Sequence, residues 1–151
     1  MIFYGGGIKM AIWQCDFQLI PQDAIENLGQ EELWQFHSIS KESLERIAEV
    51  FPKTRSWADD IIQYGENDDT CIQLFCENDI VSDIKVRISF RDLDLNKLKA
   101  ISDFAKVNMG VLIFNKKIIL PEVDEIINTI KYSDAAKFSA EPMKYLDDLS
   151  K

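Results

Sequence analysis

The tripeptide Asp83-Ile84-Lys85, preceded in the sequence by Asp68 and Asp69, is the grouping with the clearest chemical potential. Two carboxylates that hold a divalent cation, with a lysine beside the attacking water, form the D…(D/E)xK pattern of nucleases. On a strand, Ile84 would point into the core while Asp83 and Lys85 share the opposite face. The tripeptide is common by chance and the chain is acidic. We therefore predict no metal site, and a site of Asp83 and Lys85 with Asp68 or Asp69 is the alternative to be tested.

The chain has few other residues that could bind a metal or act as a nucleophile. His37 is the only histidine, and no serine or cysteine nucleophile motif surrounds it. The three cysteines form no CxxC pair, so a zinc site is not expected. The segments at 66–69 and 5–7 match neither an EF-hand nor a phosphate-binding loop. We predict no catalytic residues, no cofactor and no metal, and an enzyme is the less favoured class.

A row of cations on one strand face offers a binding surface instead. Between residues 80 and 90, apolar and polar side chains alternate, and this places Lys85, Arg87 and Arg91 on the outward face of a strand. Arginine binds carboxylates in a bidentate manner, and arginine and tryptophan are enriched at the centres of protein interfaces. We predict a candidate binding surface of Lys85, Arg87, Arg91 and Trp57. The alternative is a solvated strand face balanced by nearby carboxylates.

The overall charge limits the class of partner. Aspartate and glutamate number 26 against 17 lysines and arginines, which gives a formal charge of -9. Such a chain repels polyanions and attracts basic protein surfaces. We expect a protein partner, no nucleic acid and no membrane, because no apolar run approaches the roughly 20 residues that span a bilayer. An odd number of cysteines without a secretion signal predicts a reducing compartment, the cytoplasm.

The first nine residues suggest a different origin from the rest. Gly5-Gly6-Gly7, two codons before Met10, back-translates to a purine-rich run like a bacterial ribosome-binding site. We expect Met10 to be the physiological start, residues 1–9 to be a non-physiological leader, and the gene to be bacterial. The length favours one domain over two, so residues 10–151 are expected to form a single domain.

Apolar alternation and breaker residues predict six strands. They cover residues 11–19, 33–39, 70–75, 80–90, 110–114 and 118–120. Asn78-Asp79 and Asn115-Lys116-Lys117 suit tight turns. The segment from 53 to 69 is less regular, and its Trp57, Ile61 and Ile62 suit a short helical turn.

Helical spacing and capping residues predict four helices. They cover residues 41–51, 95–107, 122–132 and 142–149, and Ser40 and Asp94 serve as N-caps of the first two. The sum is an α+β fold, a mostly antiparallel sheet with helices packed on one face.

Several segments together resemble small uncharacterised bacterial proteins of the toxin-antidote (immunity) type. They are Ser56-Trp57, the run IKVRISFRDLD at 84–94, the helix ending DFA at 103–105, the run YSDAAKF at 132–138 and the closing Glu141-Pro142 segment with Tyr145-Leu146. The resemblance implies a cytoplasmic protein-binding domain that neutralises a toxin, and it implies no functional residue. The alternatives are a regulatory or structural interaction domain and an enzyme of unrecognised class.

Overall fold

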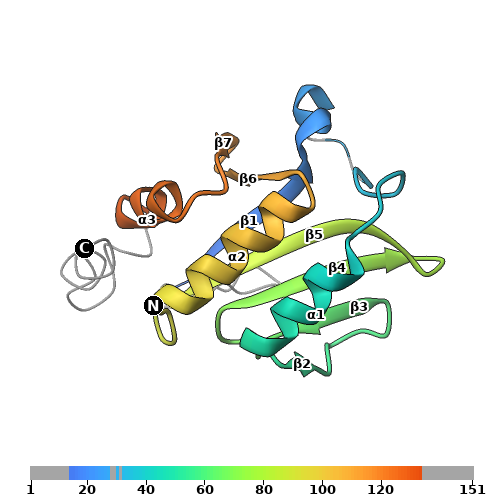
Figure 1. Cartoon of the computed structure of the whole chain (residues 1–151), viewed down its shortest axis with the longest axis horizontal. Coiled ribbons are helices and arrows are strands. Elements are labelled where there is room, and N and C mark those ends of the chain that lie inside the picture. Colours follow the sequence, from blue (N-terminus) through green and yellow to red (C-terminus); the bar gives the residue numbers. More distant parts are fainter. Residues whose placement is uncertain (1–13, 28–29, 31, 134–151) are drawn as a thin grey trace, which may run out of the picture.

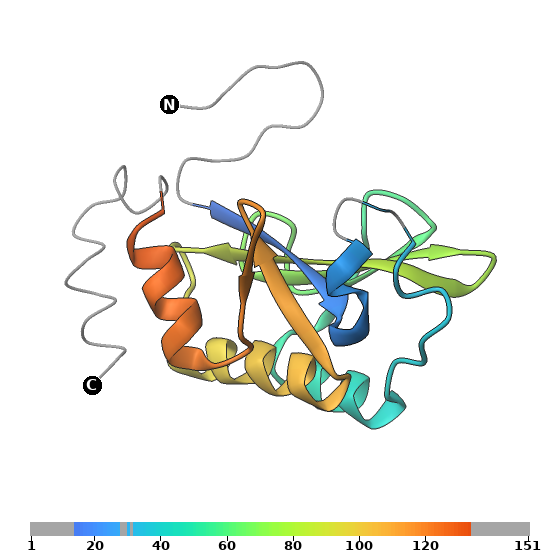
Figure 2. The same cartoon turned by 90° about the horizontal axis from the view of Figure 1, so that it is seen from above.

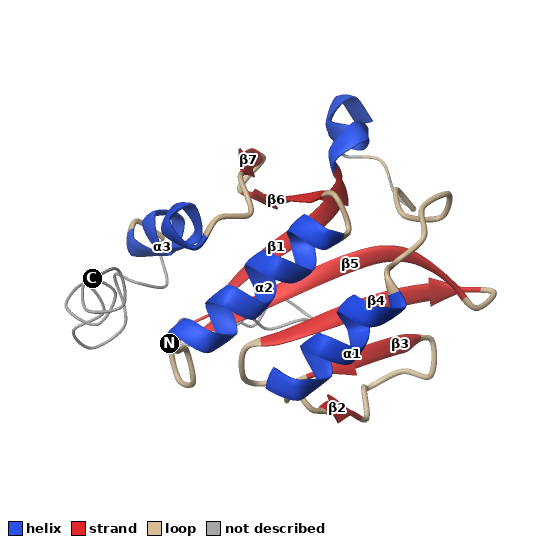
Figure 3. Cartoon of the chain, viewed as in Figure 1, coloured by secondary structure: helices blue, strands red, loops and turns tan. Residues whose placement is uncertain are grey.

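The computed structural model describes residues 14–27, 30 and 32–133. Within them the chain forms seven strands, three α-helices and one 3₁₀ helix, shown in Figures 1 and 3. The strands are β1 (Gln14–Pro21), β2 (Lys53–Thr54), β3 (Ile61–Tyr64), β4 (Cys71–Glu77), β5 (Ile80–Ser89), β6 (Gly110–Phe114) and β7 (Lys117–Ile119). The helices are η1 (Gln22–Asn27), α1 (Lys41–Val50), α2 (Leu95–Val107) and α3 (Val123–Lys131).

The strands form one antiparallel sheet in the order β2-β3-β4-β5-β1-β6-β7. β1 is inserted between β5 and β6, so the start of the described chain lies at the centre of the sheet. Seen edge-on in Figure 2, α1 and α2 lie on one side of this sheet. The predicted α+β class, with an antiparallel sheet and helices on one face, is confirmed.

The core lies between the sheet and the helical layer. From β5, Ile84, Val86 and Ile88 point to this side and are buried, as the alternation predicts. Helix residues recurring at three- and four-residue spacing meet them and exclude water from the same cluster. They include Ile47 and Phe51 near α1, Leu98, Ile101 and Phe104 of α2, and Ile126, Ile127 and Ile130 of α3.

Capping residues define where the helices begin. The Asp94 carboxylate accepts from Lys97 N at 2.8 Å, and Ser40 Oγ accepts from Ser43 N at 3.2 Å. Each satisfies a backbone donor that the first helical turn leaves without an internal acceptor. Both predicted N-caps, and the helix at residues 95–107, are confirmed.

The two tightest hairpins are also confirmed at the predicted turns. Asn78 and Asp79 have φ values of 54° and 65°, and Asn115 and Lys116 have 50° and 66°. Positive φ at both central residues is the geometry of two-residue hairpins, and asparagine and aspartate tolerate it better than most residues.

Two predictions about local structure are wrong. Residues 33–37 form turns and a bend and residues 38–39 are irregular, because the Trp34 indole is buried in the core, where its Nε1 donates to Leu19 O of β1 at 2.6 Å. The expected helical turn around Ile61 and Ile62 is instead strand β3, which pairs with both β2 and β4. The leader at 1–9 and the expected helix at 142–149 lie outside the described residues.

None of the described helices has both the length and the apolar character needed to cross a bilayer.

Candidate functional site

The sheet face opposite the helices carries a connected row of polar side chains. In register, Gln63 of β3 lies beside Gln73 of β4, which lies beside Lys85 of β5. Gln73 Nε2 donates to Gln63 Oε1 at 2.8 Å and to Asn67 Oδ1 at 3.3 Å. Gln63 and Gln73 are almost fully buried, so these hydrogen bonds offset the desolvation of their amides.

Arg87 does not belong to an exposed recognition surface. Its side chain is only 11% exposed, its Nε donates to Asp16 Oδ1 at 3.0 Å, and its Nη1 donates to Asn67 O at 2.8 Å. Burial opposes its charge, but the hydrogen bond and the negative charge of Asp16 outweigh that, so the pKa of Arg87 is raised. Alternation placed Arg87 on the correct face, but the loop at 66–69 covers it.

Lys85 is the member of the predicted cation row that stays partly accessible. Its Nζ lies 3.8 Å from Asp16 Oδ2, and its side chain is 37% exposed. It lines an open hollow of about 740 Å³ on this face of the sheet. The side chains around the hollow are Asp16, Gln18, Phe75, Asp83, Ile113 and Lys116.

The carboxylates of the nuclease-like pattern are not brought together. Asp68 lies beside β1 at Gln14, whose Nε2 donates to Asp68 O, and Gln14 pairs with Ser89. Asp83 is six residues from Ser89 along β5, which is roughly 20 Å at the rise of a strand. Asp83 Oδ1 instead accepts from Glu32 N at 3.1 Å. Within the described residues no group of three or more His, Cys, Asp or Glu could hold a metal.

Cys71 lies opposite Arg87 in the sheet and is completely buried. Burial raises the pKa of the Cys71 thiol to about 12, although the nearby Arg87 charge acts in the opposite direction. A thiol that stays protonated is a poor nucleophile. Cys71 therefore serves as a small buried side chain.

Arg91 and Trp57 lie apart from the row that contains Lys85 and Arg87. Arg91 is exposed in the turn after β5, where its backbone N donates to Ser89 Oγ at 3.2 Å. Trp57 lies in the connection between β2 and β3, and its side chain is 69% exposed. The four predicted surface residues therefore do not form one continuous surface.

Trp57 lies in a hydrogen-bonded loop at one end of the sheet. Ser56 Oγ donates to Ile61 O at 2.7 Å and also contacts Ala58 O, which closes the loop at its base. Asp60 O accepts from Cys76 N at 2.8 Å, which joins the loop to the end of β4. These bonds hold the loop next to the β4–β5 hairpin.

Carboxylates from both segments lie at this end of the sheet. Burial raises the pKa of the Cys76 thiol, and the negative charges of Asp60 and Asp79 raise it further, so both carboxylates lie near one sulfur. Asp59 and Glu77 adjoin them in sequence, and Ile80 is 52% exposed on the hairpin. We call this set the Trp57 end: Trp57, Asp59, Asp60, Glu77, Asp79 and Ile80.

The Trp57 end carries four carboxylates. Within the described part of the chain, none of its four carboxylates forms an ion pair. The sequence prediction singled out Trp57 but not these carboxylates, because they come from two loops that only the sheet pairing brings together. The acidic pairs Asp59-Asp60 and Glu77…Asp79, each beside an exposed apolar residue, were the available signal.

The single histidine has a local role. His37 Nε2 lies 2.9 Å from Asp23 Oδ1 in η1, and its ring meets Trp34 edge-on at 5.9 Å between centroids. No nucleophile joins this pair among the hydrogen bonds of His37. The contact helps to hold the turn at 33–36 against the start of η1.

Comparison with known proteins adds no identification. No model of a protein family, no curated protein and no solved structure matches this chain.

Proposed function

We propose that this chain is a bacterial cytoplasmic protein-binding domain of the immunity type, which neutralises a toxin by binding it. The observation that supports it most is the Trp57 end. There an indole that is 69% exposed shares one end of the sheet with four carboxylates, none of which has an ion-pair partner in the described residues.

The chemistry of the Trp57 end suits a basic protein surface. Tryptophan gives a large apolar contact at little conformational cost, and its ring attracts arginine and lysine through the cation–π interaction. The carboxylates at the same end of the sheet steer a cationic partner to it and fix its orientation. The formal charge of -9 adds a long-range attraction for a positively charged partner.

The loop that carries Trp57 is organised before binding. The Ser56 hydroxyl and the bond from Cys76 N to Asp60 O restrain it at both ends. A restrained loop loses less conformational entropy when a partner orders it, so more of the contact energy appears as affinity. These features favour tight binding over a transient contact.

The alternative of an enzyme or ligand-binding domain is supported by the hollow beside Lys85. Its volume of about 740 Å³ lies within the range of small-molecule sites. Its carboxylates are engaged, however: Asp16 by Arg87 and Lys85, and Asp83 by Glu32 N. A general base or nucleophile would first have to leave these partners, so protein binding remains the preferred function.

The proposal is tested by purifying the tagged chain from its native host and identifying what co-elutes. We expect one basic protein in one-to-one ratio, encoded beside this gene and toxic to cells when expressed without it. Recovery of the chain alone from cells that express the neighbouring gene would contradict the proposal.

A further inference from the structure

The open hollow beside Lys85 lies on the sheet face opposite the helices and is not used by the proposed function. Gln18 of β1 pairs in register with Lys85 of β5 on one side and with Ile113 of β6 on the other. The three side chains therefore form one row across neighbouring strands. The hollow above this row has a volume of about 740 Å³, which is within the range of small-molecule sites.

The ammonium group of Lys85 is in excess over the carboxylates near it. Its Nζ lies 3.8 Å from Asp16 Oδ2, which is too long for a hydrogen bond, and it donates none to a described residue. Asp16 Oδ1 instead accepts from Arg87 Nε at 3.0 Å. Two cations thus share one carboxylate, and the three N–H donors of Lys85 are available to another molecule.

The charges at the hollow have a positive sum although the chain is acidic. Lys116, in the turn between β6 and β7, also lines the hollow, and within the described chain it forms no ion pair. Lys85, Lys116 and the adjoining Arg87 stand against two carboxylates, Asp16 and Asp83. Exposed charges more than about 8 to 10 Å away are screened at physiological salt, so an ion in the hollow responds mainly to this local excess.

Apolar side chains flank Lys85 on both sides. Phe75 lies one strand away in β4 and is half-buried, and Ile113 lies two strands away in β6 and is buried in the floor of the hollow. Strands are about 4.8 Å apart, so Ile113 is roughly 10 Å from the strand that carries Lys85. An apolar body of about that length, anchored at Lys85, would cover Gln18 and reach Ile113.

We propose that this hollow binds a small organic anion, with its oxyanion head group on Lys85 and its apolar body across Gln18 against Ile113. An ammonium group donates charge-assisted hydrogen bonds to an oxyanion, and removal of apolar surface from water favours the contact with Ile113. Because both carboxylates that line the hollow are engaged, the site binds its ligand without supplying a general base. No residue of the Trp57 end lines the hollow, so this site is separate from the proposed toxin-binding surface.

Fluorescence titration of the full chain with two probes tests this site. Anilinonaphthalene sulfonate carries a sulfonate on an aromatic body, and phenylnaphthylamine has the same body without the sulfonate. We expect the sulfonate probe to bind in one-to-one ratio with a dissociation constant on the order of 10 to 100 µM, as is typical for about 20 non-hydrogen atoms. No binding of this probe up to about 1 mM would overturn the proposal.

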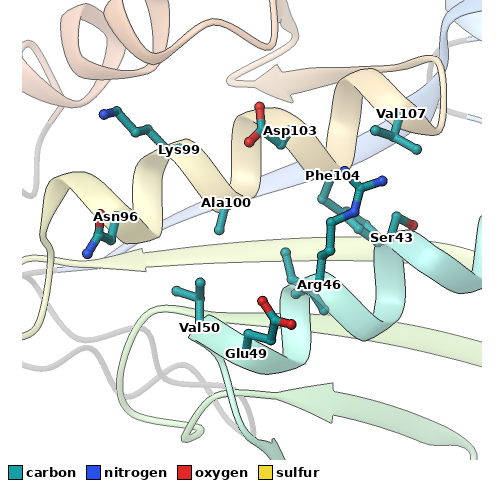
Figure 4. A pocket seen from close by; sticks show the side chains of 11 residues that line it. Ser43, Arg46, Glu49, Val50, Asn96, Lys99, Ala100, Asp103, Phe104 and Val107 are labelled. Atoms are coloured by element: carbon teal, nitrogen blue, oxygen red, sulfur yellow. The ribbon is translucent and has the colours of Figure 1, made fainter.

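Lys85→Met removes the charge and keeps most of the length of the side chain. Its affinity for the sulfonate probe should fall by about fivefold or more, while its affinity for the neutral probe should stay within about twofold. The matched control is Arg46→Met, which removes a cation from a smaller hollow of about 220 Å³ between α1 and α2, shown in Figure 4. This control should bind the sulfonate probe within about twofold of the parent chain.

Gln18→Trp tests where the apolar body lies. Gln18 is exposed, so a larger side chain is tolerated there, and it fills the space between Lys85 and Ile113. Both probes should bind this variant about tenfold or more weakly, and thermal unfolding confirms that each variant is folded. Equal losses in Lys85→Met and Arg46→Met, equal loss of both probes in Lys85→Met, or undiminished binding by folded Gln18→Trp would each overturn the proposal. None of these results bears on the binding of a toxin.

Discussion

Arg87 and Asp16 face each other across strands β5 and β1, and Arg87 Nε donates to Asp16 Oδ1 at 3.0 Å. The pair joins the centre of the sheet to the loop at 66–69, because the same guanidinium also donates to Asn67 O. Both side chains are largely withdrawn from water, at 11% and 21% exposure. An ion pair in such a position stabilises the fold only while both partners are present.

Asp16→Asn should therefore destabilise the protein by about 3 kcal/mol, because it leaves a buried guanidinium without its counter-charge. The free energy of unfolding in urea measures this. Asp23→Asn is the control, since the Asp23 carboxylate is 75% exposed and its hydrogen bonds go to the exposed His37 ring. Equal losses in the two variants would show that the Arg87–Asp16 pair has no special role in stability.

Gly65→Ala should destabilise the protein by about 1 to 3 kcal/mol, because Gly65 has a φ of +94° and alanine is strained there. An added Cβ would also lie 2.6 Å from Thr70 O, a backbone atom that cannot easily move. In Gly110→Ala, the nearest atom is the flexible Leu19 Cδ1 at 2.9 Å, and φ is not positive. In thermal unfolding, the melting temperature of Gly65→Ala should lie well below that of Gly110→Ala. The opposite order would contradict the argument from the backbone of Gly65.

Alkaline pH should weaken the fold through Cys71. Burial raises the pKa of its thiol from 9.0 to about 12 in the folded protein. Between these values the unfolded state has lost a proton that the folded state keeps. The contribution is thus fully present below about pH 9 and falls by about 1.4 kcal/mol per pH unit above it. Tyr64 and Cys76, whose pKa values burial also raises, add to the same trend.

Urea unfolding of the parent chain and of Cys71→Ala at about pH 8 and about pH 10 isolates this contribution. The alanine variant should lose less stability between the two conditions, while the parts due to Tyr64 and Cys76 remain. Identical pH dependence in both proteins would mean that the Cys71 thiol ionises as easily in the folded state as in the unfolded one.

Much of the fold follows from local signals in the sequence. Asp94 followed by a three- and four-residue apolar spacing predicted α2, and Gly110 followed by four apolar residues predicted β6, with the observed bounds. In these segments the capping residue, the breaker and the apolar pattern all agree, so local preference and tertiary packing select the same structure.

The errors arose where tertiary contacts decide the structure. The segment around Trp34 has the composition of a strand, but its burial comes from one indole docked against Leu19 O. The alternation of β5 correctly placed Arg87 opposite the core, but it could not show that the loop at 66–69 would cover it. The carboxylates of the Trp57 end are distant in sequence, and only the pairing of β3, β4 and β5 assembles them.

The most direct test of toxin binding at the Trp57 end is a calorimetric comparison of two variants. It measures the affinity of the toxin partner for Trp57→Ala and for Phe36→Ala. Phe36 is the matched control because it is 88% exposed in a loop outside the Trp57 end. We expect Trp57→Ala to weaken binding by about 30-fold or more, the loss typical of an interface hot spot. We expect Phe36→Ala to change the affinity by less than about threefold. Unchanged affinity in Trp57→Ala would contradict the assignment of the Trp57 end as the binding surface.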